Sequence, residues 1–141
     1  ASWSVFGDPF QKEPMIIGMI ACVFLMGAMT TKDIVDSEAD RKTGVKTLVN
    51  TFGTKTAAYI SLPFMCVPFL LIPLLIFTGL LSAYLLPLSI FVLPGILIFY
   101  LMKKGTENKD LENVRAWALM YITYLFYSVS FVLLIVLREY M

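Results

Sequence analysis

The chain has 141 residues, of which 59% are hydrophobic and only 15% are charged, and its formal net charge is +1. Soluble globular domains carry about 25% charged residues, so this composition excludes an ordinary soluble domain and is typical of an integral membrane protein, with membrane lipids as partners. The small net charge argues against a nucleic-acid partner. Histidine is absent, which removes the most common general base and zinc ligand.

Four apolar segments are each close to the roughly 20 residues that a helix needs to cross a bilayer. A short uncharged turn joins the second to the third, which predicts a helical hairpin. Open sheets cannot cross lipid. The predicted fold class is therefore all-α, a polytopic membrane helical bundle with four transmembrane helices, at about residues 14–31, 57–81, 84–102 and 114–137.

The positive charges predict how the bundle is oriented. Of the 11 Lys and Arg residues, nine lie in two stretches, Lys32 to Lys55 and Lys103 to Arg115. With four spans, both stretches come to the same side of the membrane, and the positive-inside rule assigns that side to the cytoplasm. We therefore expect a cell-membrane protein whose loop at about residues 32–56 faces the cytoplasm.

Prolines interrupt the second and third spans. Membrane helices tolerate proline where neighbouring groups satisfy the freed carbonyls, so kinked packing is the simpler interpretation. The alternative is that the kinks open a cavity between helices. The prolines are Pro63, Pro68, Pro73, Pro87 and Pro94.

The last span has a polar face, with Thr123, Tyr127 and Ser130 at i, i+4 and i+7. Such residues most often form hydrogen bonds across helix interfaces. The alternative is that Tyr124 and Tyr127 line a substrate chamber. There an aromatic face could stabilise a positive carbon centre by cation–π attraction.

Carboxylates are concentrated directly after the first span, where Asp33, Asp36 and Asp40 stand at i, i+3 and i+7. If one helix continued through them, all three side chains would lie on one face. Like charges at that spacing repel one another, so a cation is expected nearby. Carboxylates without histidine suit Mg²⁺, which takes oxygen ligands and shares them with substrate phosphates.

Cationic residues follow the carboxylates. Arg41 and Lys46 could hold the phosphate oxygens that the metal leaves free, and Gly44 is a plausible helix end. The alternative is a solvated charged loop with Asp36–Arg41 or Asp40–Lys46 ion pairs. The position directly after a membrane span favours a functional site, because charges at that depth tend to be functional.

The sequence from Lys32 to Leu48, KDIVDSEADRKTGVKTL, followed by Phe-Gly at Gly53, resembles the second aspartate-rich motif of the UbiA-type intramembrane prenyltransferases. The likeness covers the D-x-x-x-D core of Asp36 and Asp40, the glycine four residues later and the Lys-Thr-Leu. In that family the motif follows the sixth of nine helices. One predicted span before the motif and three after it imply that residues 1–141 are the C-terminal half of such an enzyme, part of a nine-helix bundle.

The resemblance implies Mg²⁺-dependent transfer of an isoprenyl group from an isoprenyl diphosphate to an aromatic or lipid alcohol acceptor, through an allylic carbocation. Asp36 and Asp40 would be catalytic metal ligands supported by Asp33, and Arg41 and Lys46 would contact the diphosphate. The segment looks closest to archaeal digeranylgeranylglyceryl phosphate synthases, which favours geranylgeranyl diphosphate as the donor.

The family's first motif, of the N-D-x-x-D type, is absent from these residues. We therefore expect this chain alone to be incomplete as an enzyme, with the remaining N-terminal half of the same protein as its partner. Two other classes stay open. One is a non-enzymatic transporter or channel subunit with an acidic cytoplasmic cation site, and the other is a structural membrane subunit.

Overall fold

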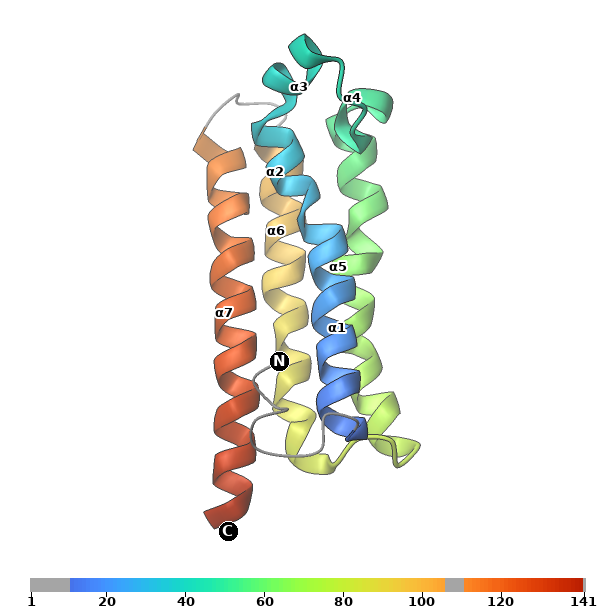
Figure 1. The fold of residues 1–141 in the computed structure, drawn as a ribbon, viewed down its shortest axis with the longest axis vertical. Helices are drawn as coiled ribbons and strands as arrows, with labels where there is room; N and C mark the ends of the chain where they lie inside the picture. The colour runs from blue at the N-terminus through green and yellow to red at the C-terminus, as the bar shows by residue number, and fades with distance from the viewer. Residues whose placement is uncertain (1–10, 106–110, 141) are drawn as a thin grey trace.

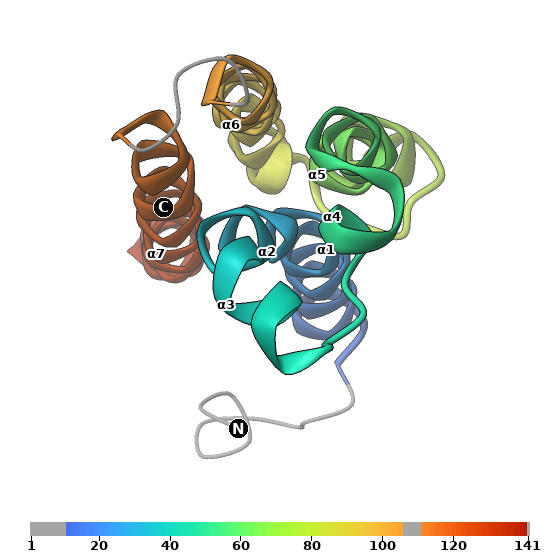
Figure 2. The same cartoon turned by 90° about the horizontal axis from the view of Figure 1, so that it is seen from above.

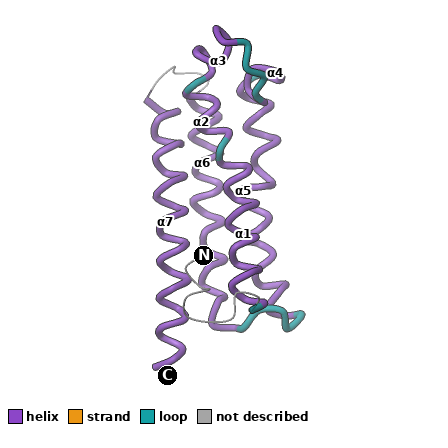
Figure 3. The backbone as a smooth tube through the Cα atoms, in the orientation of Figure 1, coloured by secondary structure: helices purple, strands orange, loops and turns teal. Residues whose placement is uncertain are grey.

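A computed structural model describes residues 11–105 and 111–140, and within these ranges every regular element is a helix (Figure 3). The spans contain long helices, and three short helices lie between the first and the second long helix. In chain order they are α1 (Lys12–Ala28), α2 (Thr30–Val35), α3 (Ser37–Thr43), α4 (Leu48–Phe52), α5 (Thr54–Phe77), η2 (Ala83–Phe91), α6 (Val92–Gly105) and α7 (Leu111–Tyr140).

Four helical stretches of the described chain are long and apolar enough to cross a membrane, which confirms the predicted all-α membrane class. They pack side by side in one bundle (Figure 1). Residues 106–110 of the cationic stretch before the last span lie outside the described residues. The spanning stretches are Lys12–Val35, Thr54–Phe77, Ala83–Lys104 and Val114–Arg138.

Two of the four spans are not uniform α-helices. The first changes from α1 to α2 at Met29, whose carbonyl accepts bonds from the amides of Lys32 at 2.9 Å and Asp33 at 3.4 Å. The third begins as the 3₁₀ helix η2 and becomes α-helical at α6. Pro87 lies inside η2, and Pro94 lies in the first turn of α6, where the missing backbone N–H is tolerated.

Close packing joins α5 to both of its neighbours at two glycines. A Cβ added to Gly27 of α1 would lie 2.6 Å from the Cβ of Phe64 and 2.8 Å from the carbonyl oxygen of Ser61. A Cβ added to Gly95 of α6 would lie 2.8 Å from the carbonyl oxygen of Met65. Small residues at membrane-helix interfaces permit such close approach of two backbones.

Aromatic rings from all four spans meet in the middle of the bundle. Phe69 of α5 lies 5.3 Å from Phe24 of α1 and 6.1 Å from Phe91 of η2, between ring centroids. Tyr127 of α7 lies 5.5 Å from both Phe69 and Phe91. Tilted and edge-on aromatic pairs at these separations are favourable beyond the area that they bury.

A polar cluster fastens three segments at the end of the bundle where α1 begins. The Glu13 carboxylate accepts hydrogen bonds from the Ser82 amide and the Tyr84 hydroxyl, each at 2.9 Å. Arg138 near the end of α7 lies 3.9 Å from the same carboxylate, and its guanidinium lies 5.3 Å from the Tyr84 ring centroid. We call these four residues the Glu13 cluster.

We predict that Gly27→Ala destabilises the bundle, because its Cβ has no space against α5. The expected loss in free energy of unfolding is about 1–3 kcal/mol, which is typical of overpacking. Thermal unfolding in detergent measures it. Gly18→Ala is the matched control on the same helix, since nothing lies within 4 Å of its added Cβ. An equal response of the two variants would contradict the close contact.

We also predict energetic coupling within the Glu13 cluster. Glu13→Gln and Tyr84→Phe should each lower thermal stability, and the double variant should lose less than the two single losses added together, by about 1 kcal/mol. The exposed Tyr100 provides the control substitution Tyr100→Phe, which should couple to Glu13→Gln by nothing measurable. Additive losses for Glu13 and Tyr84 would show that their hydrogen bond contributes nothing.

Candidate functional site

The aspartate-rich segment forms the end of the bundle opposite the turn that joins α5 to η2 (Figure 1). The short helices α2, α3 and α4 follow one another there, and each packs against the next. Viewed from above, α3 lies beside α2, and α4 lies beside the start of α5 (Figure 2). The segment therefore bridges the first and second spans where they leave the apolar part of the bundle.

The helix does not run unbroken through the three aspartates. α2 ends at Val35, and Asp36 lies between α2 and α3 with φ −87° and ψ 0°. The backbone nevertheless stays right-handed, because the Asp36 amide donates to the Lys32 carbonyl and the Asp40 amide to the Asp36 carbonyl, each at 2.9 Å. Asp36 and Asp40 therefore remain one helical turn apart.

The three carboxyl groups are crowded. Asp33, Asp36 and Asp40 are all half-buried. The Asp33 carboxyl group experiences the charges of both Asp40 and Asp36, while the charge of Lys32 acts in the opposite direction. Burial leaves less water to screen these charges. Asp33 therefore lies close enough to Asp36 and Asp40 for their charges to act on it, and a cation between these residues would offset that repulsion.

The carboxylates of Asp36 and Asp40 make no ion pair or hydrogen bond with any residue in the described part of the chain. The Asp36–Arg41 and Asp40–Lys46 pairs expected of a solvated charged loop are not formed between these described residues. Lys42 instead lies 3.6 Å from Glu38, with side chains 75% and 88% exposed. Such an exposed pair contributes little to stability.

The described carboxylates do not form a closed metal cage. Within residues 11–105 and 111–140, no group of three or more His, Cys, Asp or Glu side chains is arranged to hold a metal ion. Mg²⁺, however, commonly binds through one or two carboxylates and completes its shell with waters and substrate phosphates. Asp36 and Asp40 fit that mode, with Asp33 beside them.

Arg41 is anchored by Asn50 of α4. The Arg41 Nε donates to Asn50 Oδ1 at 3.3 Å, and Asn50 Nδ2 donates to the Val45 carbonyl, also at 3.3 Å. The backbone N–H of Asn50 donates to the Thr47 hydroxyl at 3.2 Å, and this bond caps the start of α4. Asn50 thus closes the loop between α3 and α4, and the other four guanidinium donors of Arg41 lie outside this bond.

Two glycines shape the loop around these residues. Gly44 ends α3 with φ +75°, as its position in the sequence predicts, and Gly53 precedes α5 with φ +80°. Residues with a Cβ rarely adopt such φ values. Lys46 lies between the two glycines in the stretch that connects α3 to α4, with an exposed side chain.

The two tyrosines predicted for a substrate chamber lie in different surroundings. Tyr127 is only 3% exposed, and its hydroxyl donates to the Ile17 carbonyl of α1 at 3.1 Å. Tyr124 is 38% exposed. Tyr127 therefore links α7 to α1, as the helix-interface interpretation of this polar face predicts. A chamber role for Tyr124 and Tyr127 stays a prediction.

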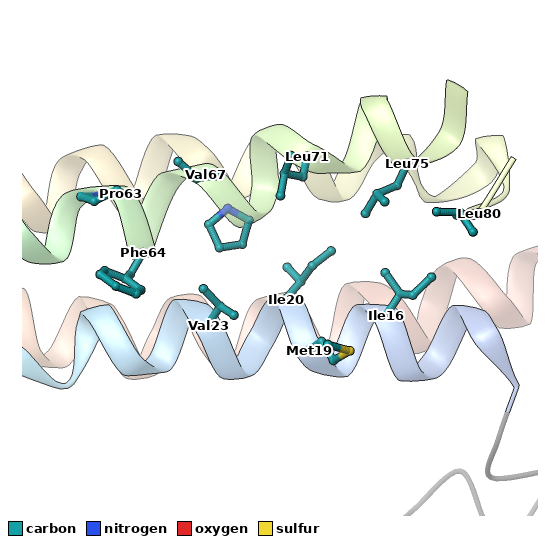
Figure 4. Close-up of a pocket in the computed structure, with 11 residues that line it drawn as sticks. Ile16, Met19, Ile20, Val23, Pro63, Phe64, Val67, Leu71, Leu75 and Leu80 are labelled. Atoms are coloured by element: carbon teal, nitrogen blue, oxygen red, sulfur yellow. The ribbon is translucent and has the colours of Figure 1, made fainter. Parts of the chain in front are cut away.

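An apolar cavity of about 560 Å³ lies between α1 and α5 (Figure 4). Pro63 and Pro68 are part of its wall, so the proline-containing second span does border a cavity. Every side chain of the wall is a hydrocarbon, a thioether or a proline ring. The lining residues are Ile16, Met19, Ile20, Val23, Pro63, Phe64, Val67, Pro68, Leu71, Leu75 and Leu80.

Sequence reasoning assigned no role to three residues that organise the site. Asn50 follows Thr47 by three residues, a spacing similar to a capping box, and this signal could have identified it. Ser61 donates a hydrogen bond to Thr30 at 2.8 Å. The two residues are 31 positions apart, and no local sequence pattern indicates the contact.

Comparison with known proteins identifies the family. The model of the UbiA prenyltransferase family matches residues 1–129, which include the aspartate-rich segment and most of the last span. No curated protein and no solved structure matches the chain. The match and the four apolar helices agree on an integral membrane protein. The chain belongs to the UbiA prenyltransferase family.

Proposed function

We propose that the protein transfers an isoprenyl group from an isoprenyl diphosphate to an acceptor within the membrane, in a Mg²⁺-dependent reaction at the aspartate-rich segment. The observation that carries the proposal is the state of Asp36 and Asp40. They are half-buried carboxylates one helical turn apart, with no ion pair in the described chain to neutralise them. Family membership supports prenyltransferase activity in general.

Each charged residue of the segment has a role in this proposal. Asp36 and Asp40 would hold Mg²⁺, and Asp33 would support them. The bound ion would supply positive charge that offsets the charge developing on the leaving diphosphate. Arg41 and Lys46 would bind phosphate oxygens, with the planar Arg41 fork able to hold two at once.

The apolar cavity between α1 and α5 supports a hydrocarbon chain as the other part of the donor. Its wall offers only apolar contacts, as a hydrocarbon chain requires. The surrounding membrane would keep water from the allylic carbocation left when the C–O bond breaks. We propose geranylgeranyl diphosphate as the donor, because the segment resembles that of the archaeal lipid synthases. The acceptor would be a lipid alcohol or an aromatic ring.

The open arrangement of the aspartates supports a second set of ligands from elsewhere in the protein. We propose that an N-terminal half of the same protein supplies the first aspartate-rich motif and completes a nine-helix bundle. The cationic residues between the first and second spans support a cytoplasmic position for the segment in the cell membrane.

We predict that Asp36→Asn and Asp40→Asn each slow diphosphate release by about 100-fold or more, because each removes a charge needed for metal binding. The assay incubates the full-length protein with geranylgeranyl diphosphate, Mg²⁺ and a panel of acceptors. Glu38→Gln is the matched control in the same helix, since Glu38 is exposed and pairs with Lys42. Release at the wild-type rate from either Asn variant, or in the presence of EDTA, would contradict the metal-site proposal.

We predict a different signature for the cationic side of the site. Arg41→Gln should raise KM for the isoprenyl diphosphate about tenfold with a smaller change in kcat, as expected for lost substrate binding. Asn50→Ala should act in the same direction by about threefold, because Arg41 loses its anchor. Lys42→Gln is the control, and a KM change as large as that of Arg41→Gln would argue for a general charge effect.

A further inference from the structure

Two buried hydroxyl groups connect the first and second spans directly below the aspartate-rich segment. The Ser61 hydroxyl on α5 donates to the hydroxyl oxygen of Thr30, the first residue of α2, at 2.8 Å. Thr30 is 2% exposed and Ser61 is 1% exposed. An unpaired hydroxyl in such an apolar place is unfavourable. The bond therefore defines one preferred rotation of α2 relative to α5.

The bond lies beside the closest approach of the two helices. Gly27 of α1 faces the carbonyl oxygen of Ser61 itself, at the 2.8 Å contact described above for an added Cβ. Thr31, next to Thr30, satisfies its hydroxyl within its own helix by donating to the Ala28 carbonyl at 2.7 Å. Thr30 is therefore the hydroxyl of this pair that reaches across to α5.

The bond also lies just beyond the irregular turn at Met29. The Met29 carbonyl is shared between the amides of Lys32 and Asp33, so the regular α-helical pattern is broken between α1 and α2. Irregular turns of this kind allow a helix to bend. A contact from Thr30 to α5 fixes the direction of α2 on the far side of that turn.

The Thr30–Ser61 bond connects the part of the chain that carries the aspartates to the part that holds Arg41. Asp33 follows Thr30 by three residues, on the same side of α2. On the other side, α5 follows α4, whose Asn50 anchors Arg41. The Thr30–Ser61 bond joins α2 to α5, and the Asn50–Arg41 bond joins α3 to α4. Both bonds therefore connect the α2–α3 part of the chain to the α4–α5 part, at two levels along the bundle axis.

We propose that Thr30 and Ser61 are positioning residues for the metal and diphosphate site. Their hydroxyl bond sets the rotation of α2, and so the placement of the Asp33 and Asp36 carboxylates relative to Arg41. The inference rests on the proposed function. It assigns Thr30 and Ser61 no contact with substrate.

The experiment uses the full-length protein and measures Mn²⁺ affinity by electron paramagnetic resonance in the presence of inorganic pyrophosphate, together with amide hydrogen exchange across residues 30–36. Thr30→Val, which keeps the shape and removes the hydroxyl, and Ser61→Ala should each weaken Mn²⁺ binding about fivefold, the equilibrium effect of one hydrogen bond. The double variant should be no weaker than either single one. Thr30→Ser, which keeps the hydroxyl, should bind Mn²⁺ with the wild-type affinity.

Ser128→Ala is the matched control, because the Ser128 hydroxyl bonds at 2.9 Å to the Tyr124 carbonyl of its own helix. If wild-type protein binds Mn²⁺ and the Thr30 and Ser61 variants bind it equally well, the positioning role is wrong, even where hydrogen exchange speeds up. If wild-type protein binds no Mn²⁺, the proposed function fails and this inference fails with it. Should Thr30→Val not fold, Ser61→Ala and Thr30→Ser give the same comparison.

Discussion

The direct contact between the backbones of α1 and α5 at Gly27 is the constraint on which the arrangement of the described helices depends. Lipid provides no hydrophobic force between helices, so their association relies on close packing and interhelical hydrogen bonds. Gly27 permits the approach, and Ser61 uses it to reach Thr30. α5 meets α6 in the same way at Gly95. The aspartate-rich segment therefore starts from two helices whose spacing is fixed.

Carboxylates at the two ends of the bundle differ in whether they have partners within the described chain. Glu13 accepts hydrogen bonds from Ser82 and Tyr84 and lies near Arg138, so its negative charge is stabilised by partners within the fold. Asp36 and Asp40 have no such partner in the described chain, although cationic residues follow them in sequence. Arg41 bonds to Asn50 instead, and Lys42 pairs with Glu38. Charged groups without an internal partner are typical of functional sites, so this contrast supports the proposed site at the aspartate-rich end.

The features that depend on local sequence, namely the membrane helices and the end of α3, could be predicted from the sequence. Four apolar stretches indicated four membrane helices, and Gly44 indicated the end of a helix that needs a left-handed residue. The interruption at Asp36 and the 3₁₀ start of the third span were not predicted from the sequence. The bonds from Ser61 to Thr30 and from Tyr127 to Ile17 join residues 31 and 110 positions apart. One sequence carries no signal for such distant pairs.

In the proposed reaction, the number of carboxylates that hold the metal would decide how metal and diphosphate bind relative to each other. A closed cage of three carboxylates would satisfy a cation alone and leave few coordination positions for phosphate oxygens. A pair such as Asp36 and Asp40 leaves those positions vacant, so metal and diphosphate should bind best together, each raising the affinity of the other by the same factor. Arg41 would add to this coupling if it binds the same phosphates, because Asn50 rather than an aspartate holds its side chain. Because Asp36, Asp40 and Arg41 form no ion pair within the described chain, their charges would stay available to the metal and the diphosphate of the proposed reaction.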